Sequence, residues 1–179
     1  MASFRYIAEI AVSAGFLAHV AAALGSDRSA TRTDAALALA ELCSAAGSGK
    51  ARRELGDDSI PRLVWMLEAK PVAERDAASR ALAALLAASS GCRKLFRKDE
   101  RGIVNAVQLF DPSAGGGVDR RYPVAVLLAV SQSRRCRKQM VAAGACGFLQ
   151  GLMAAEVDGS KKLAECLGRG KMLGVFPRT

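Results

Sequence analysis

The sequence predicts an all-α fold, an α-solenoid of about 3.5 repeats, and three observations support this expectation. Segments that open at Ser59, Gly102 and Ala143 align with one another at a spacing of about 43 residues, and a partial copy begins at Ala14. The tripeptide Cys-Arg-Lys at 92–94 recurs 44 positions later. Alanine and leucine, both strong helix formers, dominate a chain whose 179 residues are 51% apolar and 5% aromatic.

We expect one domain, because a single helical unit cannot cover its own apolar faces and needs a neighbour on each side. Its parts are a partial repeat at 1–27, repeats at about 28–70, 71–114 and 115–157, and a C-terminal cap helix with a tail at 158–179.

The first full repeat follows a helix expected over 15–24. A long helix is predicted over 30–46 because its apolar residues recur at helical spacing. These residues are Ala35, Ala38, Leu39 and Leu42. The run Gly-Ser-Gly at 47–49 ends this helix, and a short basic helix over 50–55 and a middle helix over 60–68 follow. Pro61 lies in the first turn of the middle helix, where its missing N–H costs nothing.

The second repeat has the same order of elements: a long helix over 71–88, a short basic helix over 92–98 and a middle helix over 103–110. Its long helix carries the apolar residues Ala78, Ala81, Leu82 and Leu85 at the same spacing. The acidic pair at 99–100 falls between two of these helices and suits a capping role. The glycine-rich stretch at 111–117 is a joint.

The third long helix is expected over 122–131. The run from 124 to 130 is continuously apolar and by itself would also suit a buried strand. We choose a helix because the segment superposes on the two earlier long helices. Shorter helices are expected over 134–141, 148–155 and 161–167.

Composition bounds the function. The net charge of +9 and the pI of about 9.8 favour acidic partners. The five cysteines are Cys43, Cys92, Cys136, Cys146 and Cys166. No two are closer than ten positions and no Cys-x-x-Cys pair occurs, so we expect no metal site or cofactor and interpret them as buried residues of an intracellular, cytoplasmic or nuclear protein. The first residues lack a secretory signal, and no apolar run reaches the ~18–20 residues of a membrane span.

No enzymatic activity is predicted. His19 is the only histidine and lies inside an apolar helical stretch, which favours a packed or partly exposed residue over a catalytic base. The run Gly-Ser-Gly-Lys at 47–50 lacks the glycine and the hydroxyl residue that a phosphate-binding loop requires at 44 and 51.

The three-helix units resemble armadillo repeats. The resemblance rests on Ile-Pro at 60–61 before the middle helix and on Ala-x-Ala-Leu-x-x-Leu at 36–42 in the long helix, and it is clearest over 30–110 and 134–157. The stretch 161–171 is similar to the ends of plant armadillo proteins, including the armadillo portions of plant U-box ubiquitin ligases, although no U-box is present here. The HEAT repeat is the alternative. The resemblance implies a right-handed superhelix that recruits a partner or substrate protein.

The resemblance also implies a concave groove, lined by the long helices, that holds an extended peptide. Armadillo proteins that bind nuclear-import signals carry Trp and Asn four residues apart on this helix. The matching pairs here are Leu37 and Glu41, Arg80 and Ala84, and Ala125 and Ala129, so import-receptor activity is not expected.

Helical spacing marks the same face and selects the candidate partner-binding residues. They are Asp34, Leu37 and Glu41 on the first long helix, Asp76 and Arg80 on the second, and Arg121 and Tyr122 on the third. Arg and Tyr are favoured at protein interfaces, and we expect Leu37 to be exposed between two acidic residues. Ordinary solvated helix faces are the alternative interpretation.

The short helices carry a second candidate surface, the basic ridge. Its residues are Lys50, Arg52, Arg53, Arg93, Lys94, Arg97, Lys98, Arg134, Arg135, Arg137 and Lys138. Stacked repeats would align these cations on one edge, where nucleic-acid phosphates or anionic lipid headgroups could bind. Solvating charge on exposed helices is the alternative.

The N-terminal end begins inside a unit with the apolar residues Phe4, Ile7, Ile10 and Val12. No polar cap precedes them, so we expect further repeats or self-association to cover this end.

Overall fold

The computed structural model describes residues 16–45, 59–113 and 116–172, and within these ranges the chain is helical with no strand. The N-terminal half contains α2 (Phe16–Ala23), α3 (Ser29–Ala45), a helix over 59–66, α5 (Val72–Ala88) and α6 (Ser90–Phe96). The C-terminal half contains α7 (Glu100–Gln108), α8 (Arg121–Val130), α9 (Arg134–Ala142), α10 (Ala145–Ala154) and α11 (Ser160–Met172). The predicted all-α class is confirmed.

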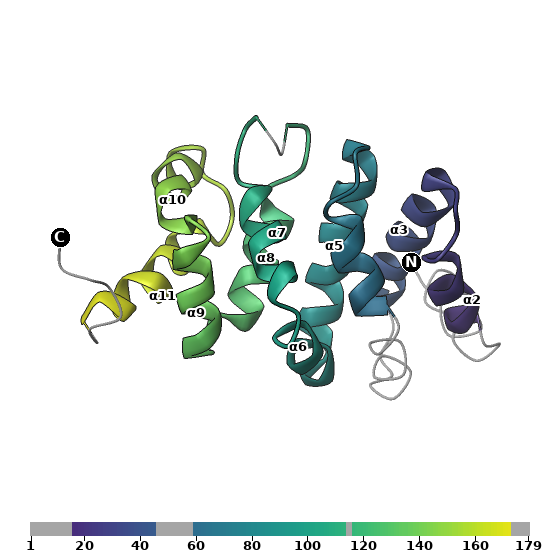
Figure 1. Ribbon diagram of the computed structural model, residues 1–179, viewed down its shortest axis with the longest axis horizontal. Coiled ribbons are helices and arrows are strands. Elements are labelled where there is room, and N and C mark those ends of the chain that lie inside the picture. The colour runs from purple at the N-terminus through teal and green to yellow at the C-terminus, as the bar shows by residue number, and fades with distance from the viewer. Residues whose placement is uncertain (1–15, 46–58, 114–115, 173–179) are drawn as a thin grey trace.

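The helices follow one another along the long axis of the molecule, from α2 and α3 at one end to α10 and α11 at the other (Figure 1). Within this row α3 packs on α5, α5 packs on α8, and α8 packs on α11, which makes a continuous layer. The second layer includes α7, α9 and α10, and α7 contacts α8 while α10 contacts α11. The core therefore runs without interruption between the two layers.

The predicted long helices lie within one or two residues of their expected bounds. α3 and α5 each have 17 residues and begin 43 positions apart, as the sequence spacing predicts. The run from 124 to 130 is a helix and not a strand, since it belongs to α8. Val124, Val126, Leu127 and Val130 are all buried because α8 has α5, α7 and α11 around it.

The recurring Cys-Arg-Lys tripeptide is explained by one local arrangement that occurs twice. Ser89 caps α6 and accepts a hydrogen bond from the backbone N–H of Cys92. Ser133 caps α9 and accepts in the same way from Cys136, and both cysteines are buried. Capping by a serine oxygen satisfies one of the free N–H groups at a helix start. The tripeptide therefore marks the start of a short helix, with its cysteine packed in the core.

The following arginine of each tripeptide closes the end of the preceding helix. Arg93 donates from Nη1 to the carbonyl of Leu86 at 2.6 Å, in the last turn of α5. Arg137 donates from Nη1 to the carbonyl of Ser131 at 2.6 Å, directly after α8. The last carbonyls of a helix lack intrahelical donors, and a cationic side chain there also opposes the helix dipole. Both arginines are thus engaged in the fold.

The structure also bears on the predictions for the acidic pair at 99–100 and for the cysteines. Asp99 caps α7 by accepting from the backbone N–H groups of Arg101 and Gly102, as predicted for this acidic pair. Cys146 is exposed and Cys166 is only half-buried, which corrects the expectation that all five cysteines are buried. The buried residues of α10 are Ala145, Leu149 and Leu152, so Cys146 is not among those that the helix turns to the core. The break at 47–49, the short helix at 50–55 and the apolar residues before 16 lie outside the described residues.

Candidate functional site

The three partner-binding residues predicted on α3 differ in how exposed they are. Asp34 and Glu41 of α3 are exposed, as expected. Leu37 is only partly exposed and packs against the hydrophobic core, which corrects the prediction of an exposed leucine between two acids. The reason is that α3 has both α2 and α5 packed against it, so a side chain beside its apolar stripe is partly covered by neighbouring helices.

Arg80 of α5 joins the three long helices. Its Nη2 donates to Oε1 of Glu41 on α3 at 2.6 Å, and 40% of its side chain is exposed. The guanidinium carbon of Arg80 lies 5.7 Å from the ring centroid of Tyr122 on α8. This distance is within the range of a cation–π contact. The sequence predicts each of these residues for the surface, and the structure brings them together.

A second arginine lies against the same ring. The guanidinium carbon of Arg121 is 5.7 Å from the Tyr122 centroid, and its Nε donates to Oδ2 of Asp119 at 2.9 Å. Hydrogen bonds from the Arg121 side chain lower the pKa of Asp119, although burial opposes this shift, and the charge of Arg80 adds to it. Asp76, another predicted residue, accepts at Oδ1 from the backbone N–H of Asp119 at 2.8 Å.

The result is a chain of contacts across α3, α5 and α8, which we call the polar line. It consists of Glu41, Arg80, Tyr122, Arg121 and Asp119. Asp34 lies on the same helix as Glu41 without a described contact to the line, and Asp76 supports it by holding Asp119. The sequence analysis missed Asp119, which precedes the third long helix and gave no helical spacing signal.

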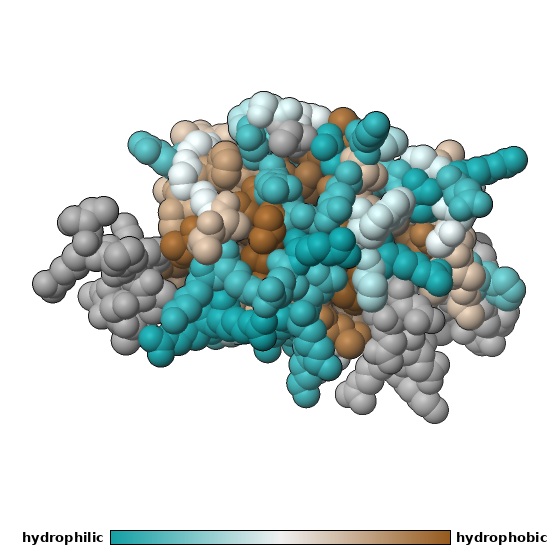
Figure 2. Space-filling model, viewed as in Figure 1, coloured by the Kyte–Doolittle hydropathy of each residue, from teal (hydrophilic) through white to brown (hydrophobic). Residues whose placement is uncertain are grey.

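Several cations of the predicted basic ridge have partners within the protein and are not free to bind a ligand. Arg93 and Arg137 bind backbone carbonyls, and Arg135 of α9 forms an ion pair with Glu100 of α7. Arg97 is half-buried. Among the described residues, the exposed cations of the ridge without a carboxylate partner are Lys94, Lys98, Arg134 and Lys138. In Figure 2 hydrophilic residues gather along the lower edge of the view, over α9 and towards α6. Lys50, Arg52 and Arg53 lie outside the described residues.

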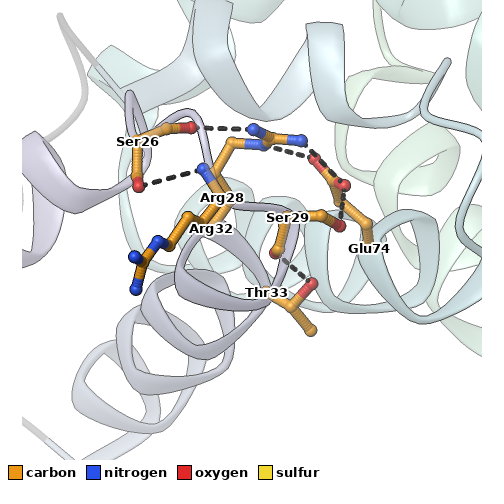
Figure 3. Close-up of polar contacts among 6 residues, drawn as sticks. All are labelled: Ser26, Arg28, Ser29, Arg32, Thr33 and Glu74. Atoms are coloured by element: carbon orange, nitrogen blue, oxygen red, sulfur yellow. Dashed lines mark hydrogen bonds and ion pairs between the residues drawn. The ribbon is translucent and has the colours of Figure 1, made fainter.

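A buried ion pair joins the first turns of α3 and α5 (Figure 3). Glu74 is fully buried and accepts from Nε of Arg32 at 2.6 Å and from the hydroxyl of Ser29 at 2.5 Å. Nη1 of Arg32 donates to the carbonyl of Ser26 at 2.7 Å. The Arg32 guanidinium carbon also lies 5.1 Å from the ring centroid of Trp65, whose side chain is half-exposed.

The electrostatics of this pair favour its charged form. Burial by itself would raise the pKa of Glu74, but the hydrogen bonds from Arg32 and Ser29 and the Arg32 charge outweigh it and lower that pKa. The hydrogen bond to Glu74 raises the pKa of Arg32. Sequence reasoning missed this pair, because Arg32 and Glu74 are 42 positions apart and nothing local marks either one.

No three His, Cys, Asp or Glu side chains in the described ranges are grouped so that they could hold a metal ion. No helix in those ranges combines the length and the apolarity needed to cross a bilayer.

Comparisons with known proteins place the chain by its fold. No protein-family model matches it, and no curated protein matches it. Two crystal structures described as engineered proteins of the Northeast Structural Genomics Consortium are similar to it, each at 22% sequence identity. One has a TM-score of 0.65 over 84% of this chain and 60% of its own, and the other has 0.72 over 90% and 39%. The chain thus spans less than two thirds of either structure, and the likeness extends to the helical fold alone.

Proposed function

We propose that this chain is a non-enzymatic protein-interaction module, an armadillo-like right-handed solenoid of about 3.5 repeats that holds a partner segment across α3, α5 and α8. The observation that carries the proposal is the polar line, which links three helices far apart in sequence through exposed charged groups around one tyrosine. The 43-residue offset of α3 and α5 and their packing in one layer with α8 support the repeat architecture.

The ion pairs of the polar line are suited to exchange partners. The Glu41 and Arg80 side chains are 64% and 40% exposed, and Arg121 is 61% exposed. Exposed pairs stabilise a protein by only about 0–1 kcal/mol. A partner carboxylate can therefore replace Glu41 on Arg80, and a partner cation can replace Arg80 on Glu41, at little cost. Tyr122 supplies apolar contact area between two guanidinium groups, which favours an extended segment of mixed charge.

The proposal is tested by selecting 12-residue peptides from a displayed random library with the full chain and measuring their affinity for variants. We expect the replacement of Arg80 and Tyr122 by alanine to weaken the selected peptides by about tenfold or more, as for interface anchors. Leu37 is kept unchanged in these variants, because its side chain packs on the core and a polar replacement would also disturb the fold. The matched control is the double alanine variant of Lys94 and Lys138, which should leave affinity unchanged. Equal affinities for both double variants would contradict the proposal.

A second function is favoured by the unpaired cations of the basic ridge, namely binding of phosphate groups in nucleic acid or in lipid headgroups. Such binding would fall steeply with salt, because phosphate neutralisation releases counterions. A salt titration with a duplex oligonucleotide and with phosphatidylserine vesicles separates the two sources. Here the Lys94 and Lys138 double variant should weaken binding while the Arg80 and Tyr122 variant should not.

A further inference from the structure

A pocket lies where the turn after α2 meets α3 and the helix over 59–66, apart from the polar line. It is bounded by the turn at 24–27, by Arg32 of α3, and by Pro61, Arg62 and Trp65 of the helix over 59–66, and its volume is about 360 Å³. We call it the Trp65 pocket. Trp65 is the only tryptophan of the chain, and half of its surface is exposed.

The Trp65 ring forms one wall of the pocket, and Arg32 packs against it. The Arg32 guanidinium lies on the Trp65 ring at 5.1 Å, and Glu74 and the Ser26 carbonyl hold that guanidinium in turn. A ring fixed in this way can accept an apolar group without losing rotamer freedom at the moment of binding. The charge of Arg32 is already neutralised by Glu74, so it attracts an incoming anion weakly.

Arg62 has unused hydrogen-bonding capacity at the same pocket. Its Nη1 donates to the carbonyls of Ala21 at 2.7 Å and Ala22 at 3.3 Å, near the end of α2. Among the described residues, Arg62 has no other acceptor and forms no ion pair. A guanidinium has five N–H donors in a planar fork that matches a carboxylate. The pocket therefore presents a cation with free donors beside an apolar wall.

At the corresponding position of the next junction along the chain there is a carboxylate, which Arg62 lacks at the first junction. Forty-three positions after Gly25 and Arg62 stand Glu68 and Asn105, the same offset that relates α3 to α5. There Oε1 of Glu68 accepts from Nδ2 of Asn105 at 2.7 Å and lies 3.9 Å from Nη1 of Arg101. At the first junction Gly25 supplies no side chain, and a Cβ built on it would lie 3.1 Å from Nη1 of Arg62.

We propose that the Trp65 pocket binds a glutamate side chain of a partner protein, flanked by an apolar residue. The partner carboxylate occupies the position that Glu68 fills at the next junction and accepts from Arg62. The flanking apolar side chain lies on the exposed part of Trp65. This proposal rests on the pocket and on the comparison of the two junctions, and it holds whether or not the polar line binds a partner.

Asp27 allows a test of whether the ligand of the pocket is acidic or basic. Its carboxylate lines the same pocket and is exposed, so it repels an acidic ligand. Removing its charge in Asp27→Asn should therefore tighten the binding of an acidic ligand, whereas it would weaken the binding of a basic one.

The experiment titrates the full chain with acetyl-Leu-Glu-amide and with its neutral isostere acetyl-Leu-Gln-amide. Tryptophan fluorescence and the single indole N–H signal in NMR report on Trp65 alone. We expect a saturable change with the glutamate peptide and about fivefold weaker binding of the glutamine peptide, as for one charge-assisted hydrogen bond at a partly exposed site. Arg62→Gln should remove this difference, and Asp27→Asn should strengthen the glutamate peptide by about twofold.

Two further variants keep the result decisive if Arg62→Gln disturbs the end of α2. Arg101→Gln is the matched control, since it removes the same charge at the next junction and should leave both affinities unchanged. Gly25→Glu places a tethered carboxylate beside Arg62 and should abolish peptide binding while circular dichroism shows an unchanged helix content. Equal affinity of the two peptides, absence of saturable binding, weaker binding by Asp27→Asn, or equal losses in Arg62→Gln and Arg101→Gln would each overturn the proposal.

Discussion

Replacing Glu74 by glutamine should destabilise the protein far more than replacing any exposed acid. Glu74 is fully buried, and three hydrogen bonds reach its carboxylate: one from Ser29 and two from Arg32. In the variant the amide NH2 group faces donors, and the Arg32 cation loses its counter-charge. Removing one partner of a buried pair costs about 3–5 kcal/mol.

The lower end of that range applies here, because water reaches part of the Arg32 side chain, which is 12% exposed, and the Ser26 carbonyl still binds it. We therefore expect a loss of about 3 kcal/mol, which corresponds to a fall in Tm of about 6–12 °C for a chain of this size. Urea unfolding followed by Trp65 fluorescence and by far-UV circular dichroism measures it, provided that the two probes give coincident transitions.

The pH dependence of this loss follows from the lowered pKa of Glu74. Its ordinary value is 4.5, and the value in the folded protein lies below that. The stabilisation is therefore fully present above about pH 4.5 and is lost as the pH falls through the folded-state pKa. The difference between the natural chain and Glu74→Gln should narrow in that acid range. Since the pair is buried, added salt should change the difference little.

Asp34→Asn is the control for this experiment, because it removes an exposed acid from the helix that carries Arg32. Its unfolding free energy should lie within about 0.5 kcal/mol of the natural chain. A Glu74→Gln cost below about 1 kcal/mol at neutral pH, the value of an exposed pair, would refute the reasoning.

Three other substitutions probe the fold and the surface. Arg80→Ala should lower stability by less than about 1 kcal/mol, because the pair that it breaks is exposed, while it weakens the peptides selected above; a large fall in Tm would show a structural role instead. Gly102→Ala should cost about 1–3 kcal/mol, since its new Cβ would lie 2.7 Å from Cε2 of Phe96, and calorimetry would expose an error if Tm did not move. Ser133→Ala should cost about 1 kcal/mol by removing the cap of α9, and amide exchange at Cys136 should accelerate; unaltered exchange there would argue against the cap.

Much of the helical pattern was predictable because it is local. The spacing of apolar residues and the positions of Gly, Ser and Pro determine where helices start and end, and α3, α5 and α8 lie within one or two residues of their expected bounds. The face carrying Arg80 and Tyr122 was predictable for the same reason, since helical geometry decides which side chains share a stripe.

The partners of those side chains could not be read in the same way. Arg93 and Arg137 stand in a repeated basic tripeptide that suggested a binding surface, yet each closes the end of the preceding helix. Leu37 stands between two acidic residues in sequence, yet it packs against the core. In both cases the neighbouring element decides the environment, and that element is remote from the local pattern.

By itself the sequence predicted the helical class that the described residues have, the 43-residue offset between α3 and α5, and the charged faces of these two helices. Tertiary structure alone decided that Glu74 is buried against Arg32 and that Arg80 meets Glu41 and Tyr122. It also decided that Gly25 lies beside Arg62 in a pocket, whereas Glu68 binds Asn105 at the next junction. The physical reason is range: helix periodicity follows from hydrogen bonds four residues apart, whereas burial and ion pairing depend on side chains about 40 positions away that meet only when the helices stack.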